Sequence, residues 1–309
     1  MELIRGLHNI QSRHRGCVLT IGNFDGVHLG HQAVLSQVKQ LAADLKLPAV
    51  VMVFEPQPLE LFNPVAAPAR LTRFREKYYW LARLGLDRML CVNFNREFAA
   101  QDPQQFIQQL LLNKLGVQHL IVGDDFCFGK NRAGNFTLLQ QAAARDGFGL
   151  TNTASLKQDE VRVSSTLIRQ ALEQSQLPQA EMMLGRPFSL MGRVRHGEKV
   201  GRQLGFPTAN VWLYRNKLPV RGVFAIEAYT AQGHFHGVAN IGARPTLQGK
   251  QEQLEAHFFD FQGDLYGQQI EVLLRHKIRA ERRFGSLAEL QQQIQLDAAA
   301  ARQFFQQQR

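Results

Sequence analysis

The segment from Gly22 to His31 holds the residues whose types and spacing most suggest chemistry. It reads GNFDGVHLGH and lies between a short apolar run and a helical pattern. His28 and His31 are three residues apart at the expected helix start, so both imidazoles can face one bound phosphate group. Such a pair can stabilise the charge of a leaving pyrophosphate. Both histidines could instead be structural, or half of a metal site that would still need a third ligand.

A second candidate anion site lies further along the chain, between Arg162 and Arg169. Ser164, Ser165 and Thr166 offer hydroxyls and unpaired amides at an expected helix start. The two arginines add permanent positive charge for phosphate oxygens. A plain helix N-cap is the alternative interpretation of the three hydroxyl residues.

A glycine-rich basic stretch in the second half could fold over phosphates. Its glycines and basic residues are Gly197, Lys199, Gly201, Arg202 and Gly205. It does not have the P-loop pattern. Thr208 and Asn210 follow, two positions apart in an extended segment, so they point the same way and could offer oxygens to Mg²⁺.

Rigid apolar side chains could support a flat ring system in the first half. They are Phe54, Pro56, Pro58, Phe62 and Phe128. For each of them, packing in the core is the alternative. His234 and His236 also alternate and could share one face of a strand, although a surface strand pair would have the same pattern.

Two different patterns of elements must position these residues. In the first half, apolar runs alternate with helical stripes, which predicts a doubly wound α/β domain with a parallel sheet. The expected strands are 17–22, 49–54, 89–94 and 120–123, and the expected helices include 73–84, 103–115 and 136–145. Ligands of such sheets bind beyond the carboxyl ends of the strands.

The second half has short strands broken by glycine-rich turns, which predicts a small antiparallel β-barrel. The expected strands are 190–195, 223–229, 235–241, 254–259 and 270–274. A final helix begins after Ser286 as its N-cap. We place the boundary near residue 184, which gives domains of residues 1–184 and 185–309.

Composition narrows the class of protein. The 309 residues include 36 Lys+Arg and 26 Asp+Glu, a formal charge of +10, and 45% are hydrophobic. The length predicts two domains, and no segment approaches the roughly 18 apolar residues of a membrane span. Three widely spaced cysteines, Cys17, Cys91 and Cys127, indicate reduced thiols in a cytoplasm. The basic residues are dispersed, which favours phosphorylated small molecules over nucleic acid.

Four segments of the first half together resemble a known family. Residues 22–31, 54–58, 123–129 and 162–169 are similar to the adenylyltransferase half of bacterial bifunctional FAD synthetases, whose superfamily is marked by HxGH. The resemblance implies that His28, His31 and Arg162 are catalytic. It implies that ATP is bound by Gly22, Asn23, Phe24, Asp25, His28, Gly30, His31, Asp125, Ser164, Ser165, Thr166 and Arg169. It places the flavin against Phe54, Pro56, Pro58, Phe62 and Phe128. Asp25 and Asp125 could instead orient their loops.

The second half resembles riboflavin kinases. The specific signature is Gly205-Phe206-Pro207-Thr208-Ala209-Asn210, and residues 237–246, 254–261, 264–267 and 277–284 also match. The resemblance implies that Glu255 is the general base and that Thr208 and Asn210 hold Mg²⁺–ATP under the glycine-rich loop. It implies that flavin is bound by Arg279, Arg282 and Phe284. Without the resemblance, Glu255 would be interpreted as a strand carboxylate facing water.

The expected function is therefore the phosphorylation of riboflavin to FMN, followed by transfer of AMP from ATP to FMN to give FAD. The expected partners are ATP, riboflavin and FMN, with Mg²⁺ and without nucleic acid or membrane. We expect a monomer or weak homo-oligomer in the cytoplasm. Three alternatives remain: a chain with one active half, a nucleic-acid-binding module that uses the +10 charge, and a tRNA-charging enzyme suggested by HxGH alone.

Overall fold

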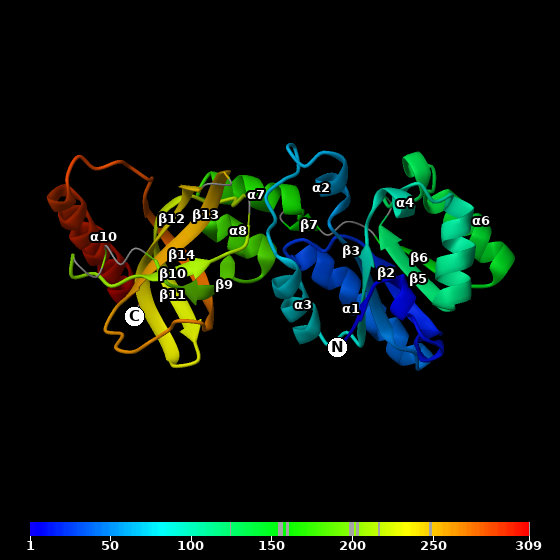
Figure 1. Cartoon of the computed structure of the whole chain (residues 1–309). Helices are drawn as coiled ribbons and strands as arrows, with labels where there is room; N and C mark the ends of the chain where they lie inside the picture. The colour runs from blue at the N-terminus through cyan, green and yellow to red at the C-terminus, as the bar shows by residue number, and fades with distance from the viewer. Residues whose placement is uncertain are drawn as a thin grey trace. The chain divides into compact units, whose positions relative to one another are not determined.

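The computed structural model describes residues 1–123, 125–153, 157–158, 161–197, 201, 204–215, 217–246 and 249–308. The chain forms two compact units (Figure 1). The first comprises Met1–Pro68 and Phe74–Ser164, and the second comprises Ala69–Arg73 and Ser165–Arg309.

The first unit is built on a six-stranded sheet in which every pair is parallel, in the order β1-β4-β3-β2-β5-β6. Its strands are β1 (Glu2–Arg5), β2 (Cys17–Ile21), β3 (Ala49–Glu55), β4 (Arg88–Asn93), β5 (Val117–Gly123) and β6 (Gly149–Thr153). The four expected strands are present, and β1 and β6 add to them. All five residues of β2 are buried, as continuous apolar strands of parallel sheets are.

Helices cover both faces of this sheet, as expected for a doubly wound fold (Figure 1). One core packs α1 (Leu29–Leu45) and α3 (Phe74–Arg83) against the sheet. The other packs α6 (Phe136–Asp146) and the π-helix Phe106–Lys114, which continues from α5 (Pro103–Gln105). The shorter elements are α2 (Pro58–Phe62), α4 (Arg96–Ala99) and a separate ladder of β7 (Lys157–Gln158) and β8 (Val161–Arg162).

The second unit contains a closed antiparallel barrel in the order β10-β13-β12-β11-β14-β9, which confirms the expected architecture. Its strands are β9 (Ser189–Arg195), β10 (Ala209–Trp212), β11 (Gly222–Thr230), β12 (Gly233–Thr246), β13 (Gly249–Phe258) and β14 (Gln269–Arg279). The C-terminal helix α10 (Leu287–Gln307) begins at the expected cap, Ser286. Its Ala298, Ala301 and Phe305 pack on the outside of the barrel.

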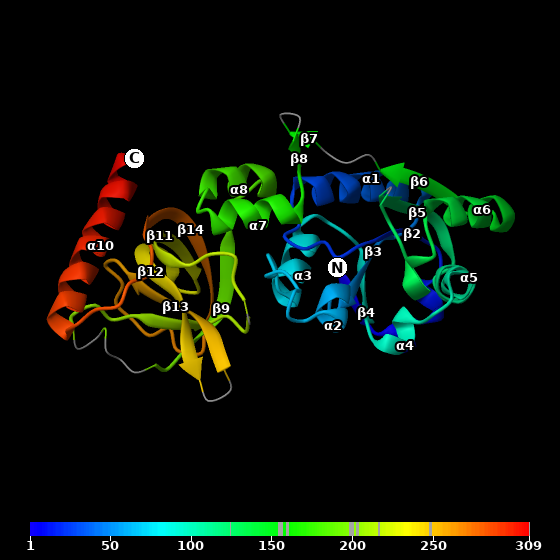
Figure 2. The same ribbon diagram turned by 90° about the horizontal axis from the view of Figure 1, so that it is seen from above.

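Two further helices, α7 (Ser165–Glu173) and α8 (Leu177–Leu184), belong to the second unit by packing (Figure 2). They contact each other, and α8 also contacts β14. The division by packing therefore falls at residue 164, whereas the change of sequence pattern near residue 184 marks the end of α8. The segment Ala69–Arg73 joins the second unit as well: the Arg169 Nε donates to the Ala69 carbonyl at 2.6 Å, and the Arg215 Nη1 donates to the Arg70 carbonyl at 2.6 Å.

The helices and the three cysteines can be compared with the expectations from composition. No helix among the described residues is long and apolar enough to cross a membrane. Cys17, Cys91 and Cys127 each carry a free thiol. Burial raises the pKa of the Cys17 thiol to about 12, so this residue acts as a small apolar core side chain at neutral pH.

We predict that Leu19→Ala destabilises the first unit by about 2–5 kcal/mol, because Leu19 is fully buried in β2 and the surrounding sheet cannot close the cavity. The measurement is urea unfolding by tryptophan fluorescence in a Trp212→Phe background, where only Trp80 of α3 reports. Leu45→Ala is the matched control, since Leu45 ends α1 with 46% of its surface exposed. Equal shifts for the two variants would contradict the prediction.

Candidate active sites

The turn between β2 and α1 holds the first candidate site in an uncommon backbone conformation. Phe24 and Val27 have φ angles of 47° and 44°, a region that non-glycine residues rarely adopt. Both are buried in the core beside α1, as is Asp25 within the turn. A Cβ on Gly22 would lie only 3.1 Å from the Phe24 ring, so a larger residue there would push against this side chain. Core packing thus holds the turn in one shape at the carboxyl end of β2.

His28 and His31 are stacked at the start of α1. His28 is the N-cap, and its Nδ1 accepts the backbone N–H of His31 at 3.3 Å. The ring centroids are 3.6 Å apart, with an angle of 18° between the planes. Burial and the nearby His28 and Lys77 hold the pKa of His31 well below its ordinary value. The His31 Nδ1 is buried and has no hydrogen-bond partner among the described residues, so the neutral ring keeps a polar atom for a ligand.

Other expected contacts of the first site lie at the same edge of the sheet. β5 is the neighbour of β2, and the Asp125 carboxylate folds back beyond its end, 3.1 Å from where a Gly123 Cβ would lie. The Val163 carbonyl oxygen lies 3.4 Å from the corresponding position on Gly30. The chain therefore reaches Ser164 beside the first turn of α1.

Four further residues expected at this site come from the later segment: Arg162, Ser165, Thr166 and Arg169. Ser165 and Thr166 form the first turn of α7. The Arg169 Nε is occupied by the Ala69 carbonyl. The side chain of Arg162 lies outside the part of the chain that can be described.

The expected flavin residues of the first unit are linked by aromatic contacts. Phe54 and Phe62 each contact Phe94, with centroids 5.4 Å and 6.0 Å apart. Phe128 joins the same chain of rings through Phe106 and Phe98. The sequence motifs did not include these three linking rings, although two of them follow β4 closely. Phe62 is 62% exposed at the end of α2, so the group offers an open apolar surface, not only a core.

Pro56 and Pro58 flank Gln57 at the beginning of α2. Pro58 is the first residue of the helix, where proline loses no hydrogen bond. The Gln57 Nε2 is buried and has no hydrogen-bond partner among the described residues. This buried donor lies between Phe54 of β3 and Phe62 of α2 in the sequence.

In the barrel, strand register places Glu255 between two asparagines. Glu255 of β13 pairs with Asn210 of β10 on one side and with Asn240 of β12 on the other. Residues directly opposite in antiparallel strands share a face. The flanking Leu254 and Ala256 are fully buried inside the barrel, so the Asn210–Glu255–Asn240 row lies on the outer face.

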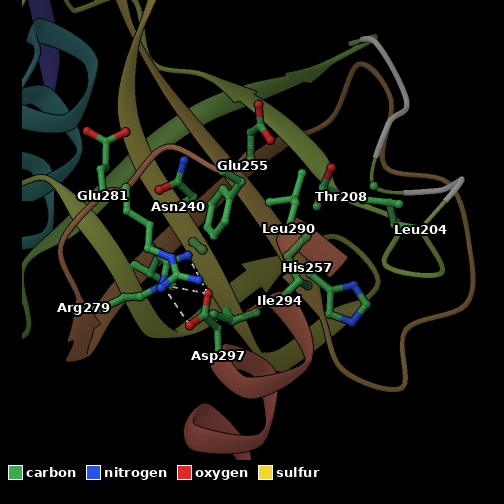
Figure 3. Close-up of a pocket in the computed structure, with 16 residues that line it drawn as sticks. Leu204, Thr208, Asn240, Glu255, His257, Arg279, Glu281, Leu290, Ile294 and Asp297 are labelled. Carbon is green, nitrogen blue, oxygen red and sulfur yellow. Dashed lines mark hydrogen bonds and ion pairs between the residues drawn. The ribbon is translucent and has the colours of Figure 1, made fainter. Parts of the chain in front are cut away.

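A cavity of about 250 Å³ covers this part of the outer face (Figure 3). Figure 3 shows Glu255 and Asn240 side by side, with Thr208 on the adjacent segment and Ile294 and Leu290 of α10 across from them. Six of the residues expected to act in the kinase reaction line it: Gly201, Thr208, Glu255, Arg279, Arg282 and Phe284. Thr208 also lines a second cavity of about 420 Å³ with Tyr266 and Phe258.

Close contacts require two glycines of the expected phosphate loop. A Cβ on Gly201 would collide with the Phe206 carbonyl oxygen. The two residues are held close together because the Phe206 N–H donates to the Gly201 carbonyl at 2.8 Å. A Cβ on Gly197 would collide with the Asn210 amide. Gly205 has a φ of 83°, which favours glycine. Lys199 and Arg202 lie outside the described residues.

The three expected flavin residues of the second unit form one cluster. The Arg279 guanidinium donates to both carboxylate oxygens of Asp297, at 2.9 Å from Nε to Oδ1 and 2.7 Å from Nη2 to Oδ2. Arg279 and Arg282 also lie over the Phe284 ring, 5.6 Å and 4.7 Å from its centroid. Asp297 is buried, so this pair ties the end of β14 to α10.

Known proteins match this chain in both units. A family model described as FAD synthetase matches residues 10–167, and one described as riboflavin kinase matches residues 184–305. The bifunctional riboflavin kinase/FMN adenylyltransferase of Escherichia coli (strain K12) is 53% identical over 307 residues, which cover 99% of this chain and 98% of that protein. The Haemophilus influenzae protein of the same name is 49% identical over 306 residues, 99% of each chain. The chain belongs to this bifunctional family.

The family membership confirms the expected activities: the chain converts riboflavin to FMN and FMN to FAD, with ATP as the nucleotide substrate. A solved structure from Streptococcus pneumoniae, titled a macrolide-efflux protein, has a TM-score of 0.82 and 26% sequence identity to this chain. The aligned region covers 98% of this chain and 99% of that protein's chain. The chain is thus similar in fold to that protein over both units.

Three further polar side chains, which were not among the expected site residues, line the cavity of Figure 3: Asn240, Glu281 and Asp297. Asn240 and Glu281 lie within the matching segments 237–246 and 277–284, whereas Asp297 lies outside every such segment. Burial raises the pKa of Glu281, with Arg221 and Arg279 acting against this effect and Glu252 adding to it. A sequence signal existed for Asp297, because this lone acid interrupts the apolar stripe of Leu290, Ile294, Ala301 and Phe305 in the final helix.

We predict that His31 makes stability fall with acidity. Its pKa in the folded protein is lowered, so below about pH 6.5 the unfolded chain binds the proton first and unfolding becomes easier. His31→Asn removes this contribution, which reduces the slope of unfolding free energy against pH by at most about 1.4 kcal/mol per pH unit. The measurement is urea unfolding at pH 7.5 to 5.5, with the exposed His8→Asn as control. Identical slopes for wild type and His31→Asn would refute it.

We predict that Asp297→Asn destabilises the barrel unit by about 1.5–3 kcal/mol, because the Arg279 guanidinium loses a charged hydrogen-bond acceptor at a buried position. Urea unfolding in a Trp80→Phe background, where Trp212 of β10 reports, measures this loss. Asp260→Asn is the matched control, since Asp260 pairs with Arg302 on an exposed surface and such pairs contribute little. A loss as large for Asp260→Asn as for Asp297→Asn would count against the buried pair.

Proposed function

We propose that the barrel carries the kinase reaction in the cavity of Figure 3 and that the sheet edge at His28 carries the adenylyl transfer. The functional boundary between the two reactions is then near residue 184. The observation that carries the kinase assignment is that six residues expected from the sequence, Glu255 among them, line one cavity on the outer face of the barrel.

For the kinase step, Glu255 is the general base. A primary alcohol must lose its proton as it attacks the γ-phosphoryl group, and a carboxylate within reach can accept it. Asn210 pairs with Glu255 across the strand register, and Thr208 lines the same cavity as Glu255. Their amide and hydroxyl oxygens suit a hard cation. Asn210 is positioned by Gln253, whose Nε2 donates to its Oδ1 at 2.6 Å.

Thr208 and Asn210 would hold Mg²⁺ bound to ATP, and the ion would neutralise charge on the transferring phosphate. Thr208 belongs to both cavities, which supports a substrate arrangement in which the nucleotide occupies the larger cavity and riboflavin the smaller one. Phe284 with Arg279 and Arg282 forms the flavin side of the smaller cavity. Because Arg279 is already paired with Asp297, its role is to hold the cavity wall.

For the adenylyl transfer, the FMN phosphate attacks the α-phosphorus of ATP and pyrophosphate leaves. No protein nucleophile is needed, since position and electrostatics lower the barrier. His28 and His31 bind the leaving group at the amino end of α1, where backbone N–H groups add partial positive charge. The residues expected to contribute from the later segment are Arg162, Ser164, Ser165, Thr166 and Arg169.

The flavin of this second step rests on the aromatic surface of Phe54, Phe62 and their linking rings. The Gln57 Nε2, which has no hydrogen-bond partner among the described residues, is the donor that we assign to a carbonyl or ring nitrogen of the flavin. The protein acts on these small molecules in the cytoplasm, as a monomer or weak homo-oligomer, without nucleic acid or membrane as a partner.

We predict that the two reactions can be abolished separately. Glu255→Gln keeps the shape of the side chain and removes the base, so FMN formation from riboflavin falls by 10² or more, the range typical of general-base catalysis. FAD formation from supplied FMN persists in this variant. His28→Asn keeps a good helix N-cap and removes the imidazole, so FAD formation falls while FMN accumulates.

The measurement is chromatography of flavins during incubation with riboflavin or FMN and Mg-ATP. Each variant carries an internal control: Glu255→Gln must keep FAD formation from FMN, and His28→Asn must keep FMN formation from riboflavin. Loss of both activities in Glu255→Gln would contradict separate sites, and absence of any flavin product from the wild type would contradict the proposal as a whole.

A further inference from the structure

A compact group of potential metal ligands lies on the outer face of the barrel, away from the kinase cavity. It consists of Glu227 on β11 and His234 and His236 on β12. Glu227 pairs directly with His236 in the strand register, and His234 lies two positions before His236, on the same face. One ligand atom of each residue lies within 4.8 Å of the others.

Each oxygen of the Glu227 carboxylate has a different neighbour. Its Oε2 lies 3.5 Å from the His234 Nε2, and its Oε1 lies 3.5 Å from the Arg275 Nε on β14. One oxygen thus faces the histidines while the other is oriented by an arginine. Ligating carboxylates in metal sites are commonly oriented in this way by an outer partner.

Aromatic side chains lie against both imidazole rings. The His236 ring stacks on Phe305 in the last turn of α10, with centroids 4.0 Å apart and an angle of 1°. The His234 ring lies over Tyr229 at 4.7 Å and nearly perpendicular to His236 at 83°. Stacking occupies the faces of the rings, whereas a metal is bound by the nitrogens in the ring plane.

We propose that Glu227, His234 and His236 form a binding site for a divalent transition-metal ion of the Zn²⁺ type. Two imidazoles and one carboxylate are a donor set that favours Zn²⁺, Co²⁺ or Cu²⁺ over Mg²⁺. With bonds of about 2.0–2.1 Å, tetrahedral ligand atoms are roughly 3.3 Å apart. The His234 side chain is 41% exposed, so it can rotate to close the remaining distance, and a fourth position stays open to water.

This site is distinct from the cavity of Figure 3. Glu227 is four residues along β11 from Val223, which lines the kinase cavity, a separation of roughly 13 Å at about 3.3 Å per residue. Helix α10 runs between the two places: Ile294 and Asp297 line the cavity, and Phe305 contacts His236. The proposal therefore does not depend on the assignment of either active site.

The test is Zn²⁺ binding by the full-length protein after chelation and removal of the chelator. Calorimetric titration should give a saturable site that His234→Ala and Glu227→Gln each weaken by 10-fold or more, while the exposed His8→Ala leaves it unchanged. Bound Co²⁺ should show the visible absorption of a nitrogen–oxygen tetrahedral site in wild type and lose it in both variants. Excess Mg²⁺ should not displace either ion.

Thermal unfolding gives a second readout, because an ion that binds only the folded chain raises its midpoint. Zn²⁺ should raise the midpoint of wild type and of His8→Ala and leave that of His234→Ala unchanged. Circular dichroism of each variant without metal establishes that it is folded. Equal Zn²⁺ affinity in wild type, His234→Ala and Glu227→Gln, or no saturable binding in wild type, would overturn the proposal.

Discussion

Hydrogen-bonded strand register is the constraint on which both candidate sites depend. In the barrel, the pairing of β13 with β10 and β12 sets Glu255 between Asn210 and Asn240. A slip by one residue would turn this carboxylate into the apolar interior and bring Leu254 or Ala256 to the surface. In the sheet, the parallel pairing of β2 with β5 brings their carboxyl ends to one edge. Closure of the barrel and burial of β2 make such slips costly.

The two sites use rigidity in different ways. At His28, a strained turn and a helix N-terminus form a small candidate site whose parts are close in sequence. At the second candidate site, Glu255 lies on a regular strand, and the walls come from α10 and from the segment around Thr208. The Arg279–Asp297 pair connects one wall to the barrel. One site is therefore shaped by local backbone geometry and the other by long-range packing.

That difference explains what could be predicted from sequence. The alternation of strands and helices, the barrel and the HxGH turn follow from local patterns, and the structure and comparisons confirm the fold and the activities. Strands β1 and β6 were not predicted because they are short strands at the edges of the sheet, where few apolar residues mark them in the sequence. The linking rings Phe94, Phe98 and Phe106 were not predicted because Phe54 and Phe128, which they contact, lie more than 20 residues away in the sequence. Asp297 could have been noticed as the acid in an apolar stripe, but its pairing with Arg279 follows only from the packing of α10 on the barrel. Which residues touch substrate remains a prediction.

The segment Ala69–Arg73 has a consequence for how the two catalytic functions can be handled separately. It is encoded inside the adenylyltransferase half, yet its carbonyls accept hydrogen bonds from Arg169 and Arg215, and it packs with the barrel unit. Neither unit is therefore one continuous stretch of chain, and no single cut yields both intact. A kinase half released at residue 184 would leave a buried arginine, Arg215, without its backbone acceptors. Each unit is therefore built from two separate stretches of the chain, and the two units alternate along the sequence.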